Sequence, residues 1–463
     1  MATEVDNNNS TTTEGEVESK QMGDKYIWGI FIALCLISIV EAYSASSREV
    51  LSAGIYAPLV KHTIMLVVGG LIVYFMQRIP YYKYIKPIPV FGLVTFLLLV
   101  LTLLFDAVND AQRAVPLCGG FAIQPSEMAK FGIVLLIAWA TAKNQKPDGV
   151  KTTGIVICAM IIAAFGGLMV RQGLSNTILL MSISVALLLI AGIGWMQLIK
   201  LFVFYVVLGI LLLGASLAID SIMPKKSDSD KNAETTTLAV DGTASDVAPD
   251  VTAQSLSTDK KEEVSSIKKF FGRIDTWINR LDRFNDDTPL YKQPRTKENA
   301  QEHFARMAQA NSKVIGTGPG NSRECSRLPL AYIDYVYSII VEELGYAGGI
   351  VVLVLYLWLF ARAGSIAWRC KRTFPALLVM GMAVFIVFQA LFHICINVGV
   401  MPVSGQPLPL ISKGGTSILI TCMAFGIMLS VSRTAVQSNK SKEVKEEIEQ
   451  LPTDLQGSNL SQK

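Results

Sequence analysis

Long apolar runs recur along this chain, and their length limits what it can fold into. Ten of them are found, at residues 26–45, 58–77, 87–105, 128–142, 153–170, 176–194, 200–221, 335–361, 375–397 and 416–434. A bilayer core of about 30 Å needs roughly 20 apolar residues in a helix. In lipid only helices and closed barrels satisfy the backbone polar groups. The sequence therefore predicts an all-α integral membrane protein with about ten transmembrane helices.

Composition excludes several other classes of protein. Of the 463 residues, 51% are hydrophobic and 17% are charged, whereas soluble domains carry about 25% charged residues. No basic run has interleaved aromatic residues, so nucleic acid is not an expected partner. The sequence shows no paired-cysteine motif and no histidine cluster, so no structural zinc site is predicted.

The positions of Lys and Arg predict the orientation. Short loops after the even-numbered runs are rich in positive charge, which places them in the cytoplasm. Both termini are then cytoplasmic. The predicted divisions are a disordered tail 1–25, helices one to seven in 26–222, an extracytoplasmic loop 223–334, helices eight to ten in 335–434, and a tail 435–463.

The loop 223–334 has two parts. Residues 224–265 are rich in Ser, Thr, Asp and Lys and are expected to be disordered. Residues 266–306 carry apolar residues at helical spacing, which predicts an amphipathic helix. Such a helix lies on the bilayer surface, caps a cavity or packs as an ordinary helix, and the sequence leaves these alternatives open.

The stretch LPLAYIDYVYSIIVEELG, residues 328–345, places acids beside a membrane-crossing run. Asp334 lies where the polar loop meets the apolar run, and Glu342 and Glu343 follow. Ionisable groups near a bilayer usually persist because a site uses them. For Glu343 the favoured interpretation is instead an acid that snorkels at a helix end. The preceding GTGPGNS, residues 316–322, is a turn whose backbone amides can approach an anion.

Three further polar segments are predicted on the same, outward side. MPVSGQPLPLISKGGTS (401–417) contains Ser412 and Lys413, residues 109–132 contain Arg113, Glu127 and Lys130, and RQGLSNT (171–177) begins with Arg171. Irregular backbone at membrane depth lines a cavity or is buried in protein. Together these segments predict one outward-facing polar site. Cys118 and Cys325 also fall in outward loops, so the sequence does not decide whether they form a disulfide.

These segments resemble the SEDS family of bacterial membrane proteins (FtsW, RodA and SpoVE). QPSEMAK, GTGPGNS, LPLAYIDYVYSIIVEELGYAGG and PVSGQPLPLISKGGTS carry the resemblance, which covers about residues 26–222 and 266–434. The sequences GPGNS and QPLPLISKGGTS resemble those of the divisional member, FtsW, more than those of RodA. The resemblance implies a ten-helix SEDS fold with a large extracytoplasmic loop between helices seven and eight.

The resemblance also implies a function. It implies a peptidoglycan glycosyltransferase that polymerises lipid II with a class B penicillin-binding protein and other division proteins. The location would be the bacterial inner membrane at the division septum. The carboxylate of the family's H-T-D-F motif, its proposed catalytic residue, falls on Asp334.

The chain departs from the family pattern near this site. Tyr332 and Ile333 replace the His and Thr before Asp334. An arginine, Arg113, is kept while the following tryptophan is lost, and the acid of the P-D-x-G-T segment has no counterpart. The asparagine of Q-A-x-x-N reads His393, beside a retained Gln389. For His393 the favoured interpretation is a hydrogen-bonded packing residue.

The chemistry suits these residue types. A sugar hydroxyl needs a base as it attacks, and desolvation at a membrane edge would raise the pKa of Asp334 toward neutrality. Cations stabilise the departing pyrophosphate. The candidates are Lys130, Arg113, Arg171 and Lys413, and the other predicted substrate-binding residues are Ser412, Gln389, Glu127 and Glu342.

Other functions and ligands stay open at this point. An inverting displacement requires no enzyme nucleophile, and a divalent cation held by Glu127 or Glu342 is neither required nor excluded. The alternative functions are an elongation polymerase of the RodA type, a lipid II flippase or transporter, and a division scaffold without enzymatic activity.

Overall fold

This computed structural model describes residues 23–44, 57–104, 115–116, 122–146, 149–205, 280, 284, 292–294, 296, 299–325, 327–328 and 334–436. The chain divides into two compact units, one made of Met1–Gly194 with Asp275–Lys463 and the other of Trp195–Ile274. The described part of the smaller unit contains an apolar helix, Trp195–Tyr205. Residues 224–265, predicted to be disordered, lie outside the described residues.

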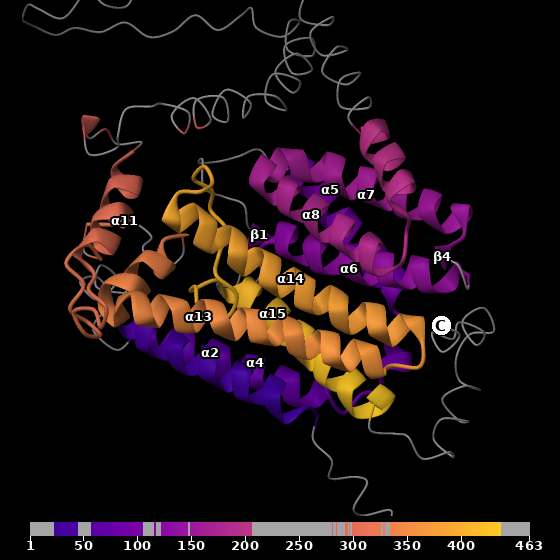
Figure 1. Cartoon of the computed structure of the whole chain (residues 1–463), viewed down its shortest axis with the longest axis horizontal. Helices are drawn as coiled ribbons and strands as arrows, with labels where there is room; N and C mark the ends of the chain where they lie inside the picture. Colours follow the sequence, from indigo (N-terminus) through magenta and orange to yellow (C-terminus); the bar gives the residue numbers. More distant parts are fainter. Residues whose placement is uncertain are drawn as a thin grey trace, which may run out of the picture. The chain divides into compact units, whose positions relative to one another are not determined.

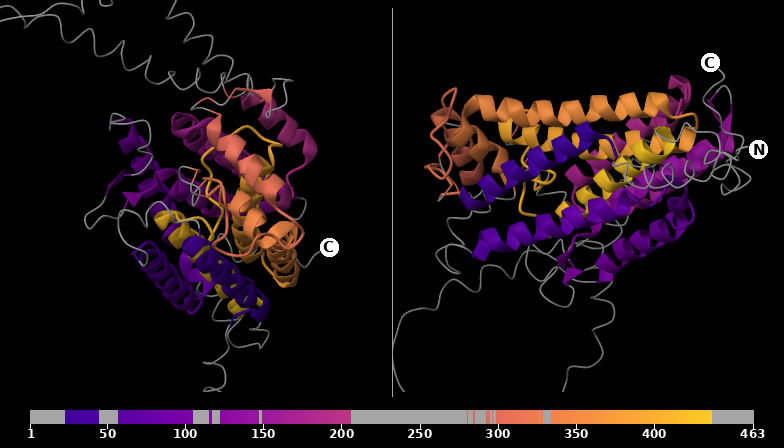
Figure 2. Two further views of the ribbon diagram at one scale, coloured as in Figure 1. Left: turned by 90° about the vertical axis from the view of Figure 1, so that its left-hand side faces the viewer. Right: turned by 90° about the horizontal axis from the view of Figure 1, so that it is seen from below.

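The larger unit consists mainly of helices that lie side by side (Figure 1, Figure 2). They are α2 (Lys25–Ser44), α4 (Ala57–Met76), α5 (Ile88–Leu104), α6 (Pro125–Lys143), α7 (Thr152–Gln172), α8 (Leu174–Ile190), α11 (Ala300–Asn311), α13 (Val336–Arg369), α14 (Thr373–Val398) and α15 (Gly415–Val431). Short elements are η1 (Tyr81–Tyr84), η4 (Ser432–Val436) and the antiparallel pairs β1 (Val115–Pro116) with β2 (Ala122–Ile123) and β3 (Gln145–Lys146) with β4 (Gly149–Val150).

Six of the described helices are long and apolar enough to cross a membrane. They span Lys25–Ser44, Leu59–Met76, Thr152–Val170, Val336–Arg369, Thr373–Val398 and Gly415–Thr434. Shorter apolar helices cover Ile88–Thr102, Ser175–Ile190 and Trp195–Tyr205. The predicted all-α membrane class is confirmed, while the count of ten transmembrane helices stays a prediction.

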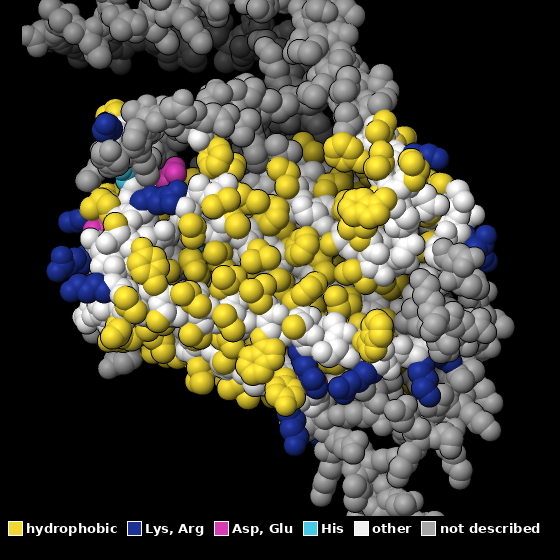
Figure 3. All heavy atoms as spheres, in the orientation of Figure 1, with side chains coloured by type: hydrophobic (Ala, Val, Ile, Leu, Met, Phe, Trp, Pro, Cys, Tyr) yellow, Lys and Arg dark blue, Asp and Glu magenta, His cyan; other side chains and the backbone are white. Residues whose placement is uncertain are grey.

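Burial separates central from peripheral helices. Nearly every side chain of α6 is buried, and α14 packs against α13, α15, α6 and α8. The peripheral α4 instead exposes Val60, Ile64, Val67 and Leu71 at spacings of three and four. Hydrophobic side chains form a broad band on the face shown in Figure 3, with Lys and Arg toward its margins. This is the surface that a lipid environment requires.

The helix α13 is broken near its start, which the predicted run 335–361 did not show. Gly345 has φ 75° and ψ −179°, and the helix continues beyond the predicted end to Arg369. The segment 313–318 fills the break. Thr317 N and Gly318 N donate to the carbonyl oxygens of Glu342 and Glu343 at 3.0 and 2.9 Å. The amides of Tyr346 and Ala347 donate back to residues 313 and 314, so the freed backbone groups are satisfied.

The predicted amphipathic helix 266–306 lies mostly outside the described residues. Its end overlaps α11, which continues past Arg306 to Asn311. This helix packs against α13 and α14, and Gln309 Nε2 donates to Ser338 Oγ at 2.9 Å and to the carbonyl oxygen of Asn397 at 2.7 Å. The described part is therefore an ordinary packed helix.

Candidate active site

A stripe of polar side chains runs along the buried face of α14. Gln389, His393 and Asn397 are spaced four residues apart, so they lie on one face of the helix, and each is at most 1% exposed. Gln389 and His393 contact the segment between α14 and α15, Gln389 also contacts α6, and Asn397 contacts the start of α13. The sequence FQALFHICIN carries this spacing, but Asn397 was not among the predicted site residues.

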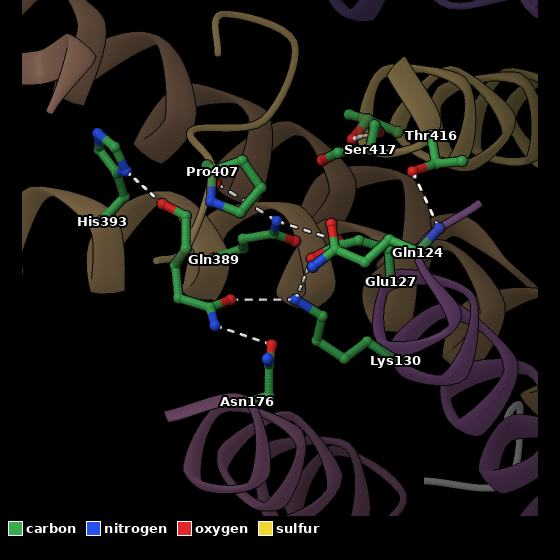
Figure 4. Close-up of polar contacts among 11 residues, drawn as sticks. Gln124, Glu127, Lys130, Asn176, Gln389, His393, Pro407, Thr416 and Ser417 are labelled. Atoms are coloured by element: carbon green, nitrogen blue, oxygen red, sulfur yellow. Dashed lines mark hydrogen bonds and ion pairs between the residues drawn. The ribbon is translucent and has the colours of Figure 1, made fainter. Parts of the chain in front are cut away.

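Lys130 and Glu127 form a buried ion pair at the start of α6 (Figure 4). Lys130 Nζ lies 2.6 Å from Glu127 Oε1 and donates to Gln406 Oε1 at 3.1 Å. Glu127 Oε2 accepts a hydrogen bond from Gln389 Nε2 at 3.1 Å. Gln406 Nε2 donates to Asn176 Oδ1 at 2.8 Å. The predicted residues Lys130, Glu127 and Gln389 are thus brought together, and the cation is already matched by a carboxylate.

The broken segment between α14 and α15 is held by side chains of the surrounding helices. Its carbonyl oxygens from residue 406 onward accept hydrogen bonds from Gln389 (to Pro407, 3.3 Å), Tyr356 (to Pro409, 2.6 Å) and Ser38 (to Leu410, 2.7 Å), while His393 Nδ1 lies 2.6 Å from the carbonyl oxygen of Gln406. His393 is therefore confirmed as a hydrogen-bonded packing residue. These contacts fix irregular backbone inside the helical unit, as membrane depth requires.

Leu410 has a backbone conformation that is rare for its residue type. Its φ is 64°, and such strain persists where the surroundings over-determine it, often at functional sites. The next two positions complete the turn. Ser412 Oγ accepts a hydrogen bond from Leu408 N at 2.8 Å, so this predicted substrate-binding hydroxyl has a structural partner. Lys413 follows directly, and its charge acts on the imidazole of His62 in α4.

Asp334 is half-buried and lies immediately before α13. Its carbonyl oxygen accepts a hydrogen bond from Asn397 Nδ2 at 3.2 Å. The neighbouring Tyr335 is buried, and within the described residues its hydroxyl has no hydrogen-bond partner.

Glu342 and Glu343 face the glycine–proline turn. Glu342 accepts hydrogen bonds from the Ser322 hydroxyl and, at 3.1 Å, from Arg323 N. Glu343 accepts them from the Ser44 hydroxyl and, at 3.1 Å, from Gly320 N. Glu343 is 0% exposed, so the interpretation as a snorkelling acid is wrong. Glu342 is brought to this turn, and in the described part of the chain it makes no hydrogen bond to Lys130, Glu127 or Gln406.

Several predicted residues cannot be placed in the site. Arg113 and Cys118 lie outside the described residues, as does the side chain of Arg171. The sulfur of Cys325 lies 3.5 Å from the carbonyl oxygen of Ser44. Gln172 Nε2 donates to Thr102 Oγ1 at 2.8 Å. Within the described ranges no group of three His, Cys, Asp or Glu side chains is arranged to hold a metal ion.

Gln406 and Asn176 were missed from the sequence. Both lie in segments identified as polar, but Gln406 contacts Lys130, and Asn176 contacts Gln406, from positions far apart in the chain. The resulting arrangement has the backbone of Asp334 at one end of the α14 stripe and the paired Lys130 and Glu127 at the other. Such a site can accept a proton and orient an anionic substrate without a protein nucleophile.

Comparisons with known proteins show the family of this chain. The model of the FtsW/RodA/SpoVE family of cell cycle proteins matches residues 24–226 and 273–437. A protein of Burkholderia thailandensis named probable peptidoglycan glycosyltransferase FtsW is 26% identical over 418 residues, covering 88% of this chain and 77% of its own. The protein of the same name from Pseudomonas fluorescens is 25% identical over 437 residues and covers 91% of each chain.

Solved structures show the same fold. A chain of a peptidoglycan synthase complex aligns with a TM-score of 0.59 at 21% identity, covering 90% of this chain and 99% of that one. The Rod shape determining protein RodA of Thermus thermophilus aligns with a TM-score of 0.55 at 20% identity, covering 90% and 98%. At these identities the likeness is one of fold.

Proposed function

Because the chain belongs to the FtsW/RodA/SpoVE family of cell cycle proteins, we propose that it is a peptidoglycan glycosyltransferase that polymerises lipid II into glycan strands. Its relatives from Burkholderia thailandensis and Pseudomonas fluorescens carry that activity in their names. The proposed role is septal wall synthesis during division, since those names are FtsW. An elongation role like that of RodA is the alternative.

One observation supports the chemistry most. A single helix, α14, connects the proposed base to the cation cluster, because Asn397 bonds the backbone of Asp334 and Gln389 bonds Glu127. Proton acceptor and charged groups are therefore held in a fixed relation by one rigid element. Such preorganisation is what a transfer without a covalent intermediate requires.

The proposed step is an inverting displacement. A hydroxyl oxygen of one saccharide attacks the anomeric carbon of the other, and the bond from that carbon to the lipid pyrophosphate breaks. The hydroxyl proton passes to the Asp334 carboxylate, and the pyrophosphate leaves with the electron pair. No serine or cysteine nucleophile is needed.

The cations divide into two groups in this proposal. Lys413 adjoins the strained turn and is the proposed pyrophosphate contact, with Arg113 and Arg171 as further candidates. Lys130 is paired with Glu127. We propose that this ion pair orients Gln406 and Gln389, and that Lys130 also adds positive potential to the site. Ser412 and Glu342 are proposed to shape the substrate site. Ser412 does so from the strained turn at Leu410, and Glu342 from the glycine–proline turn. A divalent cation that helps to neutralise the pyrophosphate is compatible with this proposal but is not required by it.

Partner and location follow from the family. A fold match in a peptidoglycan synthase complex supports a penicillin-binding protein of class B as partner, beside other division proteins. The proposed location is the bacterial inner membrane at the septum, with both termini in the cytoplasm.

The experiment is polymer formation from lipid II in detergent, with the full chain and its transpeptidase partner. Detergent leaves no compartments, so a flippase yields no product there. Glycan strands resolved on a gel support the proposal. Absence of strands, with lipid II crossing the bilayer of reconstituted vesicles, would establish transport instead.

A further inference from the structure

Asn397 uses its whole side chain to join α14 to the start of α13. Nδ2 donates to the carbonyl oxygens of Asp334 at 3.2 Å and of His393 at 2.9 Å. Oδ1 accepts from Ser338 N at 3.2 Å and from Ser338 Oγ at 2.9 Å. A primary amide has two donors and two acceptor positions, so none is left for another partner.

The start of α13 needs such a contact. The first N–H groups of a helix have no partner within it, and Tyr335, at the N-cap position, makes no side-chain capping hydrogen bond. Ser338 N donates to the carbonyl oxygen of Tyr335 at 3.0 Å, and Asn397 adds a second acceptor from another helix. The same amide holds the carbonyl group of Asp334, so the residue before the helix is fixed together with its first turn.

We propose that Asn397 is a positioning residue for Asp334. It sets where this carboxylate lies relative to the Lys130 cluster, because α14 also carries His393, which contacts Gln406, and Gln389, which contacts Glu127. The inference rests on the proposed function, since it assumes that Asp334 is the base. It adds a residue that contacts no substrate and acts through the base alone.

Loss of this contact has a specific kinetic consequence. A base works only within hydrogen-bond reach of the proton it takes. A displacement of about 1 Å at a reacting group can lower a rate by roughly 100-fold. The groups proposed to bind the pyrophosphate keep their contacts when Asn397 is shortened. The turnover number should therefore fall while KM for lipid II stays the same.

Asn397→Ala is the main variant, and Gln309→Ala is its matched control. The control also loses two hydrogen bonds in this region, at 2.9 and 2.7 Å, but it leaves the bond from Asn397 to Asp334 intact. Steady-state polymerisation of lipid II by the full chain with its partner gives kcat and KM. We expect kcat to fall about 10- to 100-fold in Asn397→Ala and to remain near wild type in Gln309→Ala, with KM unchanged in both.

Asn397→Asp separates positioning from capping. A carboxylate still accepts from Ser338 and stabilises a helix start, but it cannot donate to the Asp334 carbonyl oxygen. We expect this variant to keep a lower melting temperature than wild type, because one buried carboxylate oxygen faces the carbonyl oxygens of Asp334 and His393 without a donor, and not to recover kcat. Recovery of both would show that Asn397 is only a cap, and this variant also decides the matter where Asn397→Ala does not fold.

Asp334→Asn distinguishes failure of this inference from failure of the proposed function. If Asp334→Asn polymerises normally, the base assignment is wrong and Asn397 has nothing to position. If Asp334→Asn is inactive while Asn397→Ala keeps a wild-type kcat, the inference alone is overturned. Inactive Asp334→Asn with a reduced kcat and unchanged KM in both Asn397 variants supports it.

Discussion

Gly320 donates its backbone N–H to the carboxylate of Glu343 at 3.1 Å. The glycine–proline turn therefore approaches an anion, as its sequence suggests, but the chain itself supplies that anion from α13. Glu342 engages the next residues of the turn in the same way through Arg323 N. These contacts of Glu342 and Glu343 with Arg323 and Gly320, which we name the clasp, hold the turn against the broken helix.

Glu343→Gln should destabilise the protein. Both carboxylate oxygens accept hydrogen bonds, from Ser44 and Gly320, and an amide would turn a donor toward one of these donors. A buried group left unsatisfied costs about 1–3 kcal/mol, so we expect a lower melting temperature in detergent. An unchanged melting temperature would show that the clasp contributes nothing.

Glu41→Leu should have the opposite effect. Glu41 is 1% exposed in α2, neither of its carboxylate oxygens has a hydrogen-bond partner among the residues that the structure describes, and the charge of Glu343 acts on it. Burial of a polar group without hydrogen bonds costs about 1–3 kcal/mol in proteins, so an apolar replacement should raise the melting temperature. A clear decrease would mean that Glu41 binds something that stabilises the folded state.

Gly345→Ala should be strongly destabilising. Gly345 has φ 75°, and a Cβ there would lie 2.2 Å from the carbonyl oxygen of Val314. Left-handed backbone alone costs a residue with a side chain about 1–3 kcal/mol, and the clash adds to it. Gly364→Ala in the same helix is the control, since a Cβ there meets nothing within 4 Å. Equal melting temperatures for the two variants would contradict the observed break.

The sequence predicts long helices well because a membrane-crossing run is a local signal. The run 375–397 corresponds to α14 (Thr373–Val398), and 153–170 to α7 (Thr152–Gln172). The break at Gly345 was not predicted, because a single glycine is common within membrane helices and does not by itself mark a break. It exists because the segment 313–318 packs there, which is a tertiary contact.

The candidate site was predicted in part for the same reason. Glu127 and Lys130 are three residues apart, so a helix brings them together. Their contact with Gln406 joins positions 276 residues apart, and no local pattern records it. The burial of Lys130 was therefore missed. This cation was expected in an outward-facing polar site, and it is instead paired with Glu127 inside the protein.

Lys130→Met should be more harmful alone than in combination. Removal of one partner of a buried ion pair leaves an uncompensated charge and costs about 3–5 kcal/mol. Adding Glu127→Gln removes that charge, so the double variant should melt closer to wild type than Lys130→Met does. Thermal unfolding of the two single variants and the double variant measures this coupling. Simple addition of the two losses would show that the pair is not coupled.

Asp334 is proposed to take the proton during glycan polymerisation. The sharpest test compares Asp334→Asn with Glu302→Gln in polymer formation from lipid II, with the transpeptidase partner present. Glu302→Gln removes a nearby carboxylate whose charge also reaches Tyr335. We expect at least about a 100-fold loss of rate for Asp334→Asn, as for removal of a general base, and near-normal polymerisation for Glu302→Gln. Wild-type polymerisation by Asp334→Asn would show that this carboxylate is not the base.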